Sequence, residues 1–138
     1  MTKASNTSKA SVPKVALILE DEADIRFIIE SILTELGYFC INVPDIHSAI
    51  GIFKYNQISL MTIDILVPAD TYEDEIIDNG LAFVRFAKKN GFNGKCICVS
   101  GFADMLSNDP MLKEFNYILG KPFTAEELTK AVSSEKSS

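Results

Sequence analysis

The sequence contains no tryptophan, a single histidine and only three cysteines among 138 residues. Three cysteines cannot all pair within one chain, and Cys96 and Cys98 alternate within one apolar run. We therefore expect reduced thiols in a core, as in a cytoplasmic protein, and no disulfide framework. Two cysteines are also too few to close a zinc site. The histidine, His47, has no catalytic neighbour in sequence, which disfavours a role for it in group transfer.

The chain also lacks long hydrophobic runs and an excess of basic residues. No stretch reaches the roughly 18 consecutive apolar residues of a membrane span, and residues 1–13 lack the apolar centre of a secretory signal peptide. We therefore expect a cytoplasmic protein with no membrane partner. The 13 Lys and Arg residues are outnumbered by 19 Asp and Glu, giving a net charge of −6. Nucleic-acid binding requires a basic face, so direct binding of nucleic acid is not expected.

The negative charge is concentrated in one segment. Residues 69–79 contain five acidic residues and no basic one, which accounts for −5 of the net charge of −6. We interpret this segment as a long solvated insertion, with partner docking or the attraction of cations as the alternatives.

The apolar residues that are present suffice for one core. Hydrophobic residues make up 47% of a chain whose 138 residues are the usual size of a single domain. Residues 1–13 and 134–138 are polar and lack a periodic apolar face, so we expect a flexible lead and a flexible tail around one domain at residues 14–133.

Strand-like and helix-like patterns alternate five times within this domain. Short apolar runs predict strands at residues 15–19, 38–43, 59–63, 95–99 and 117–119. Helices are expected at residues 23–36, after a cap at Asp45, from Gly80, at residues 102–115 and after a capping box formed by Thr124 and Glu127. A long loop is expected between Asp64 and Gly80. Five such units predict an α/β fold with a parallel sheet.

Reactive side chains follow four of the five predicted strands. Glu20 and Asp21 follow the first strand, Asp64 the third, Ser100 the fourth and Lys121 the fifth. Parallel sheets bind ligands beyond the carboxyl ends of their strands, so these groups should meet at one edge. Clustered carboxylates need a cation to remain ionised together, and hard oxygen ligands suit Mg²⁺. A hydroxyl and an ammonium group are what a transferred phosphoryl group requires.

Four motifs occur in one order: LILEDEADIR, the segment from Asp64 to Pro68, CVSG and KPF. Together they closely resemble the receiver domain of two-component response regulators, over roughly Lys14 to Ser133. The resemblance implies a flavodoxin-like, CheY-like (βα)5 sandwich, with a five-stranded parallel sheet in the order 2-1-3-4-5 and helices on both faces.

The resemblance also assigns roles by position. It implies that Asp64 is the phosphoacceptor, that Ser100 is the switch hydroxyl and that Lys121 forms an ion pair with the phosphoryl group. In the family, the bond from this lysine to the following proline is usually cis. The phosphoryl donor would be a sensor histidine kinase or a phosphotransfer protein, and the output a changed protein-interaction surface rather than enzymatic catalysis.

The implied metal is Mg²⁺. Glu20, Asp21 and Asp64 would organise it, together with the backbone carbonyl of Leu66. Three features depart from the family's pattern, and one of them is the loop from Pro68 to Gly80, which is longer than usual. The first acidic residue is a glutamate where aspartate is commoner, and the position of the family's aromatic switch residue is taken by Ile118, with Tyr117 one residue earlier.

Three other functions fit the pattern less well. A phosphorylation-independent scaffold would not need the full set of reactive residues. An aspartyl-phosphate hydrolase needs an acid two residues after its nucleophile, where this chain has Leu66. An FMN-binding protein needs a phosphate-cradling loop after the first strand, where three acidic residues, at positions 20–22, would repel phosphate.

Overall fold

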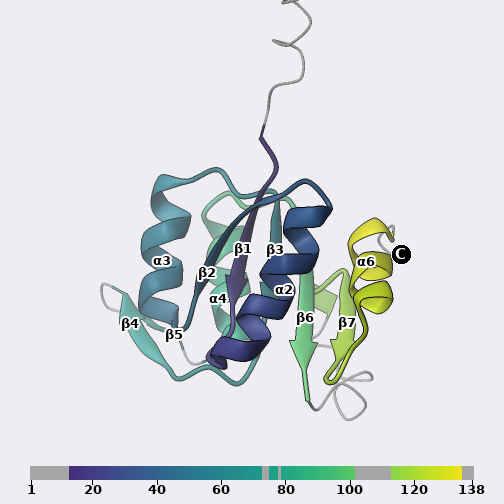
Figure 1. Cartoon of the computed structure of the whole chain (residues 1–138). Helices are drawn as coiled ribbons and strands as arrows, with labels where there is room; N and C mark the ends of the chain where they lie inside the picture. The colour runs from purple at the N-terminus through teal and green to yellow at the C-terminus, as the bar shows by residue number, and fades with distance from the viewer. Residues whose placement is uncertain (1–12, 73–74, 78, 102–112, 135–138) are drawn as a thin grey trace, which may run out of the picture.

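The computed structural model describes residues 13–72, 75–77, 79–101 and 113–134. Its main sheet has five strands, and each hydrogen-bonded pair within it is parallel. These strands are β1 (Val15–Leu19), β2 (Phe39–Val43), β3 (Leu60–Ile63), β6 (Lys95–Ser100) and β7 (Tyr117–Gly120). Their order is β2-β1-β3-β6-β7, which is the predicted 2-1-3-4-5 when these strands alone are counted (Figure 1). The predicted fold class is confirmed.

Helices pack on both faces of the sheet. The helices α2 (Ala23–Glu35) and α6 (Ala125–Ser133) lie against one face, and α3 (Ile46–Tyr55) and α4 (Gly80–Lys89) lie against the other (Figure 1). Alternate residues of β1 explain the two layers: Leu17 and Leu19 join the cluster that contains α3 and α4, and Ala16 and Ile18 join the cluster that contains α2 and α6. Because both faces are buried, the strand reads as a continuous apolar run.

The predicted helix caps are present. The Asp45 carboxylate accepts a hydrogen bond from the Ser48 amide at 2.8 Å at the start of α3. Thr124 and Glu127 form the reciprocal capping box that starts α6. Among the described helices, none has the length and apolar character needed to cross a bilayer.

The three cysteines are free thiols, as the sequence predicted. Cys96 and Cys98 are fully buried in the core between the sheet and the α3–α4 layer. Burial raises the pKa of Cys98 to about 12 and raises that of Cys96 as well. Both thiols therefore remain protonated and act as small apolar side chains.

The acidic segment was predicted as a loop, and this prediction is wrong for part of it. Strands β4 (Asp70–Tyr72) and β5 (Glu75–Ile77) pair in an antiparallel ribbon. Ile77 explains why the segment folds, because its side chain is only 1% exposed and belongs to the same core cluster as α3 and α4. His47 on α3 also gains a neighbour here, with its Nδ1 3.5 Å from the Asp70 Oδ2.

Most of the helix predicted at residues 102–115 falls on residues 102–112, outside the described part of the chain. Strand β1 has its predicted bounds, and the other strands and α2 each differ from the predicted range by one residue at one end, which is within the usual uncertainty at element ends.

Candidate functional site

The sheet register brings the predicted site residues to one edge. Leu19 and Ile63 are the last residues of the neighbouring strands β1 and β3 and are paired, so Glu20 and Asp64 leave the sheet side by side. The Asp64 amide donates to the Leu19 carbonyl at 2.9 Å, which fixes this alignment. On the other side of β3, the Lys121 amide donates to the Ser100 carbonyl at 3.0 Å.

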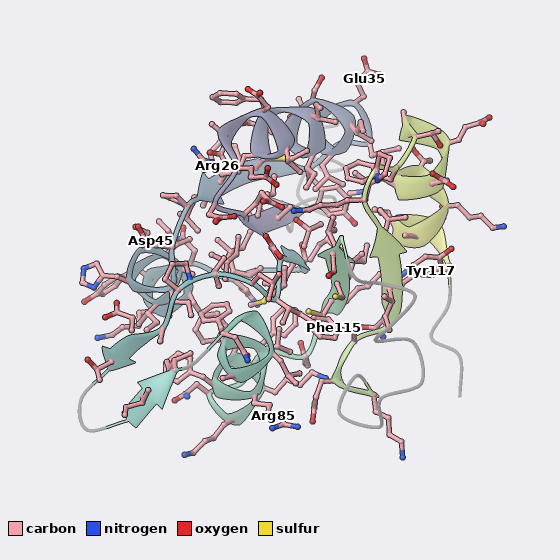
Figure 2. All side chains as sticks on the ribbon, turned by 90° about the horizontal axis from the view of Figure 1, so that it is seen from below. Arg26, Glu35, Asp45, Arg85, Phe115 and Tyr117 are labelled. Carbon is pink, nitrogen blue, oxygen red and sulfur yellow. The ribbon has the colours of Figure 1, made fainter. Side chains whose placement is uncertain are left out.

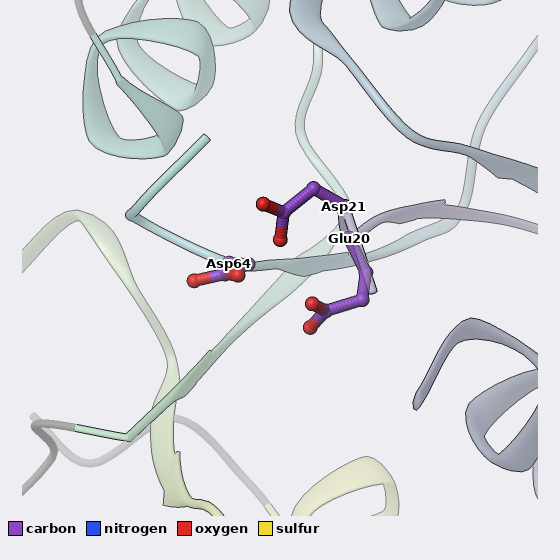
Figure 3. Close-up of side chains that lie close together, drawn as sticks. All are labelled: Glu20, Asp21 and Asp64. Carbon is purple, nitrogen blue, oxygen red and sulfur yellow. The ribbon is translucent and has the colours of Figure 1, made fainter. Parts of the chain in front are cut away.

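Three carboxylates form the centre of the site. Glu20, Asp21 and Asp64 each offer an oxygen, and these oxygens all lie within 4.8 Å of one another (Figure 3). Glu20 and Asp64 are buried, whereas Asp21 is exposed and its carboxylate has no hydrogen bond or ion pair within the described part of the chain. Hard oxygen donors with one ligand facing solvent fit a hydrated divalent cation such as Mg²⁺.

The Lys121 ammonium joins these acids. Its Nζ lies 2.9 Å from Glu20 Oε1, 3.4 Å from Asp64 Oδ2 and 3.3 Å from Glu22 Oε1. Burial alone would lower the pKa of Lys121, but the hydrogen bond to Glu20 and the charge of Asp64 outweigh it, and the pKa lies above its ordinary value. Lys121 is therefore a permanent cation at the edge of the sheet. The Lys121–Pro122 peptide bond is cis, as the resemblance implies.

Glu20 is the residue of this cluster whose negative charge is disfavoured by its surroundings. The pKa of Glu20 is raised from 4.5 to about 7: burial raises it most, the hydrogen bond from Lys121 lowers it, and the nearby charge of Asp64 raises it. In the metal-free protein, Glu20 therefore takes up a proton near neutral pH. Its ionised form destabilises the fold, because a raised carboxyl pKa means that stability falls as the pH rises from the unfolded value to the folded one.

We expect the Lys121→Met variant to lose more unfolding free energy than wild type does when the pH is raised from 6 to 8. Loss of the ammonium partner raises the pKa of Glu20 further, so the Glu20 charge becomes costly at pH 8 while a proton neutralises it at pH 6. The expected loss in unfolding free energy is about 3 kcal/mol at pH 8, the scale for breaking a buried ion pair. Urea unfolding at both pH values, without divalent cations, measures it.

Lys130→Met is the matched control, because Lys130 is an exposed lysine of α6. It should change stability little at either pH. A Lys121→Met protein as stable as wild type at pH 8, or one with equal losses at both pH values, would contradict this account of the cluster.

The segment after β3 orients the Asp64 carboxylate. Its Oδ1 accepts a hydrogen bond from the Leu66 amide at 3.0 Å, which leaves Oδ2 toward Lys121. The Leu66 side chain is 57% exposed and borders a hollow of about 460 Å³. This hollow is lined by Asp21, Glu22, Asp64, Leu66, Gly101 and Lys121. The Asp64 carboxylate thus lies at the base of this hollow, buried by its surroundings and accessible from the open side of the hollow. The role of the Leu66 carbonyl as a metal ligand stays a prediction.

Ser100 is the last residue of β6 and is fully buried, at the same edge of the sheet as Asp64. In β7, Ile118 takes the position of the family's aromatic switch residue, and Tyr117 precedes it. Their side chains lie on opposite faces of the sheet: Ile118 packs toward the α3–α4 layer, and Tyr117 packs toward the α2–α6 layer. A strand side chain changes face with each residue, so Tyr117 does not substitute for an aromatic residue at position 118.

The structure adds two residues to the predicted site. Glu22 was recognised only as part of an acidic triplet, but its carboxylate contacts Lys121 and its amide donates to Glu20 Oε2 at 3.1 Å. Arg26 was not assigned a role, and its Nη1 donates to the backbone carbonyl of Glu20 at 2.9 Å. A basic residue five positions after Asp21 was the only available signal for this contact.

Comparisons with known proteins bear on the family and the fold. A family model described as the response regulator receiver domain matches residues 16–133. A CheY-like receiver domain from Methylobacillus flagellatus superimposes with a TM-score of 0.72 at 24% identity, covering 88% of this chain and 97% of that one. A response regulator from Thermotoga maritima, solved in complex with Mg²⁺-BeF, gives a TM-score of 0.72 at 23% identity, with coverage of 86% and 96%. At these identities, the structural likenesses show the fold.

Curated relatives share a shorter segment. The probable transcriptional regulator ycf27 of Porphyridium aerugineum is 38% identical over 52 residues, which cover 38% of this chain and 22% of that protein. The corresponding protein of Guillardia theta is 36% identical over 52 residues, which cover 38% and 20% of the two chains. The matched segment thus spans about a fifth of the length of these relatives.

Proposed function

Since this chain belongs to the response regulator receiver domain family, we propose that it accepts a phosphoryl group on Asp64 in a Mg²⁺-dependent reaction. The proposed donor is the phosphohistidine of a sensor histidine kinase or phosphotransfer protein. Phosphorylation would switch a protein-interaction surface, so the domain acts as a signalling module in phosphorelay rather than as an enzyme. We place this module at residues 14–133, in the cytoplasm; the ends expected at residues 1–13 and 134–138 fall, apart from residues 13 and 134, outside the residues that the structure describes.

The observation that carries the proposal is the setting of Asp64. One carboxylate oxygen is held by the Leu66 amide and the other lies 3.4 Å from the Lys121 ammonium, at the base of an open hollow. A carboxylate oxygen in this position can attack the phosphorus atom of a donor that enters the hollow. The new bond joins this oxygen to phosphorus, and the bond from phosphorus to the donor breaks, with its electron pair leaving on the donor. The product is an acyl phosphate.

The surrounding charges fit the same step. Lys121 would pair with the phosphoryl oxygens as negative charge gathers beside Glu20 and Asp64. Glu20, Asp21, Asp64 and the carbonyl of Leu66 would hold Mg²⁺, which would supply further charge neutralisation for phosphoryl transfer. The Thermotoga maritima relative solved with Mg²⁺-BeF, and a Burkholderia pseudomallei relative solved with a phosphorylated aspartic acid and a calcium ion, support this assignment by analogy.

The proposal predicts that the wild-type protein gains one phosphoryl group when incubated with acetyl phosphate and Mg²⁺. Intact-mass spectrometry measures the product, which should be labile in base, as acyl phosphates are. Omitting Mg²⁺ and adding EDTA should leave the protein almost unmodified. An unmodified wild-type protein under the first condition would favour the phosphorylation-independent scaffold instead.

A further inference from the structure

Arg26 links the first turn of α2 to the loop that carries the acidic pair. Its guanidinium Nη1 donates to the Glu20 carbonyl at 2.9 Å and to the Asp21 carbonyl at 3.3 Å. Its backbone amide donates to the Glu22 carbonyl at 3.0 Å. One arginine therefore holds three consecutive carbonyls of the loop between β1 and α2. Figure 2 labels Arg26 beside α2, on the opposite side of the sheet from Arg85 on α4.

These contacts matter most for Asp21. Glu20 is oriented by its own side-chain contacts, with Lys121 and with the Glu22 amide. The Asp21 carboxylate has no such contact within the described residues, so the direction in which its side chain leaves the backbone depends on how the backbone is held. Two peptide carbonyls held by one Nη1 restrict rotation on both sides of the Asp21 Cα. The side chain of Asp21 is thereby directed toward Glu20 and Asp64 (Figure 3).

We propose that Arg26 is a positioning residue for the cation site: by holding the carbonyls of Glu20 and Asp21, it directs the Asp21 carboxylate to the cation. This inference rests on the proposed function, because it assumes that a divalent cation binds at this cluster. Groups that orient metal ligands from behind typically contribute 10–100-fold to metal affinity.

The positive charge of Arg26 has the opposite effect on cation affinity from its positioning role. The direction in which the affinity changes when Arg26 is replaced therefore distinguishes the two. A guanidinium close to the site repels a divalent cation, so its removal would strengthen cation binding if charge were its only influence. Loss of positioning would weaken binding. A purely structural role in α2 would lower stability and leave cation affinity unchanged.

The experiment is calorimetric titration of the full chain with Mg²⁺, for wild type, Arg26→Met and Arg26→Lys. We expect Arg26→Met to bind Mg²⁺ about tenfold more weakly than wild type. Arg26→Lys should also bind more weakly, since it keeps the charge but replaces the planar guanidinium with a single ammonium group. It also serves as the test variant if Arg26→Met fails to fold. Asp21→Asn sets the scale for loss of the ligand itself.

Arg85→Met is the matched control, because Arg85 is the chain's other arginine and its Nε lies 3.8 Å from Glu114 Oε2 on the far side of the sheet. It should bind Mg²⁺ like wild type. The inference is overturned if folded Arg26→Met binds Mg²⁺ as tightly as wild type or more tightly, if Arg26→Lys matches wild type, or if Arg85→Met is weakened equally. Failure of wild type itself to bind Mg²⁺ would count against the proposed metal site and its function.

Discussion

The Asp64→Asn variant is expected to gain no phosphoryl group from acetyl phosphate and Mg²⁺ under conditions that fully modify wild type. The amide keeps the shape of the side chain and removes the nucleophilic oxygen, so the reaction has no acceptor at the base of the hollow. Glu20 does not replace it, because both of its oxygens lie within 3.1 Å of Lys121 and it is buried. Intact-mass spectrometry of the two proteins measures the difference.

This loss should not come from unfolding. The charge of Asp64 raises the pKa of Glu20, so an uncharged residue at position 64 relieves repulsion inside the site. We expect Asp64→Asn to be at least as stable as wild type in urea. Asp24→Asn, an exposed aspartate in the first turn of α2, is the matched control and should be phosphorylated like wild type. Equal modification of Asp64→Asn and wild type would reject Asp64 as the acceptor.

The Gly80→Ala variant is expected to lose about 3 kcal/mol of unfolding free energy, at the upper end for overpacking a close contact. A Cβ at this position would lie 2.3 Å from the Asp64 carbonyl oxygen and 2.7 Å from the Ile63 Cγ2. The Gly80 amide also donates to the Ile65 carbonyl at 3.0 Å. The start of α4 therefore lies directly against the backbone of Asp64, the proposed phosphoacceptor. The added methyl group must displace either α4 or this backbone segment.

Gly51→Ala is the matched control, because Gly51 lies within α3 and a Cβ there would meet no atom within 4 Å. This substitution should raise stability by about 1 kcal/mol through helix propensity. Urea unfolding of both variants gives the comparison, and phosphorylation of Gly80→Ala should also be slower because Asp64 is displaced. A Gly80→Ala protein with wild-type stability would show that the contact is not as close as the structure has it.

The sequence predicted the fold because its strands are buried on both faces. A short apolar run such as residues 15–19, followed by a helix-length segment and repeated five times, indicates inner strands of a parallel sheet, and the edge where the reactive residues lie then follows from the strand ends. The convergence of Glu20, Asp21, Asp64 and Lys121 could be predicted for this reason, without knowledge of any side-chain contact.

The remaining features depend on contacts that leave no periodic pattern in the sequence. The β4–β5 ribbon has only three residues in each strand, and it is anchored by the burial of Ile77 rather than by a pattern of its own. The contacts of Arg26 join a side chain to backbone carbonyls, which any sequence provides equally. The partnership of Glu20 with Lys121 depends on the reach of the longer glutamate side chain across the sheet edge.

The most direct test of the central claim is to locate the phosphoryl group. Borohydride reduces an acyl phosphate to an alcohol, so treatment of the phosphorylated protein converts the modified aspartate into homoserine, which peptide mass spectrometry can place in the sequence. We expect homoserine at position 64 alone, and only in samples given both acetyl phosphate and Mg²⁺. Homoserine at position 21 or within residues 69–79, or a base-stable phosphoryl group on a hydroxyl side chain, would contradict it.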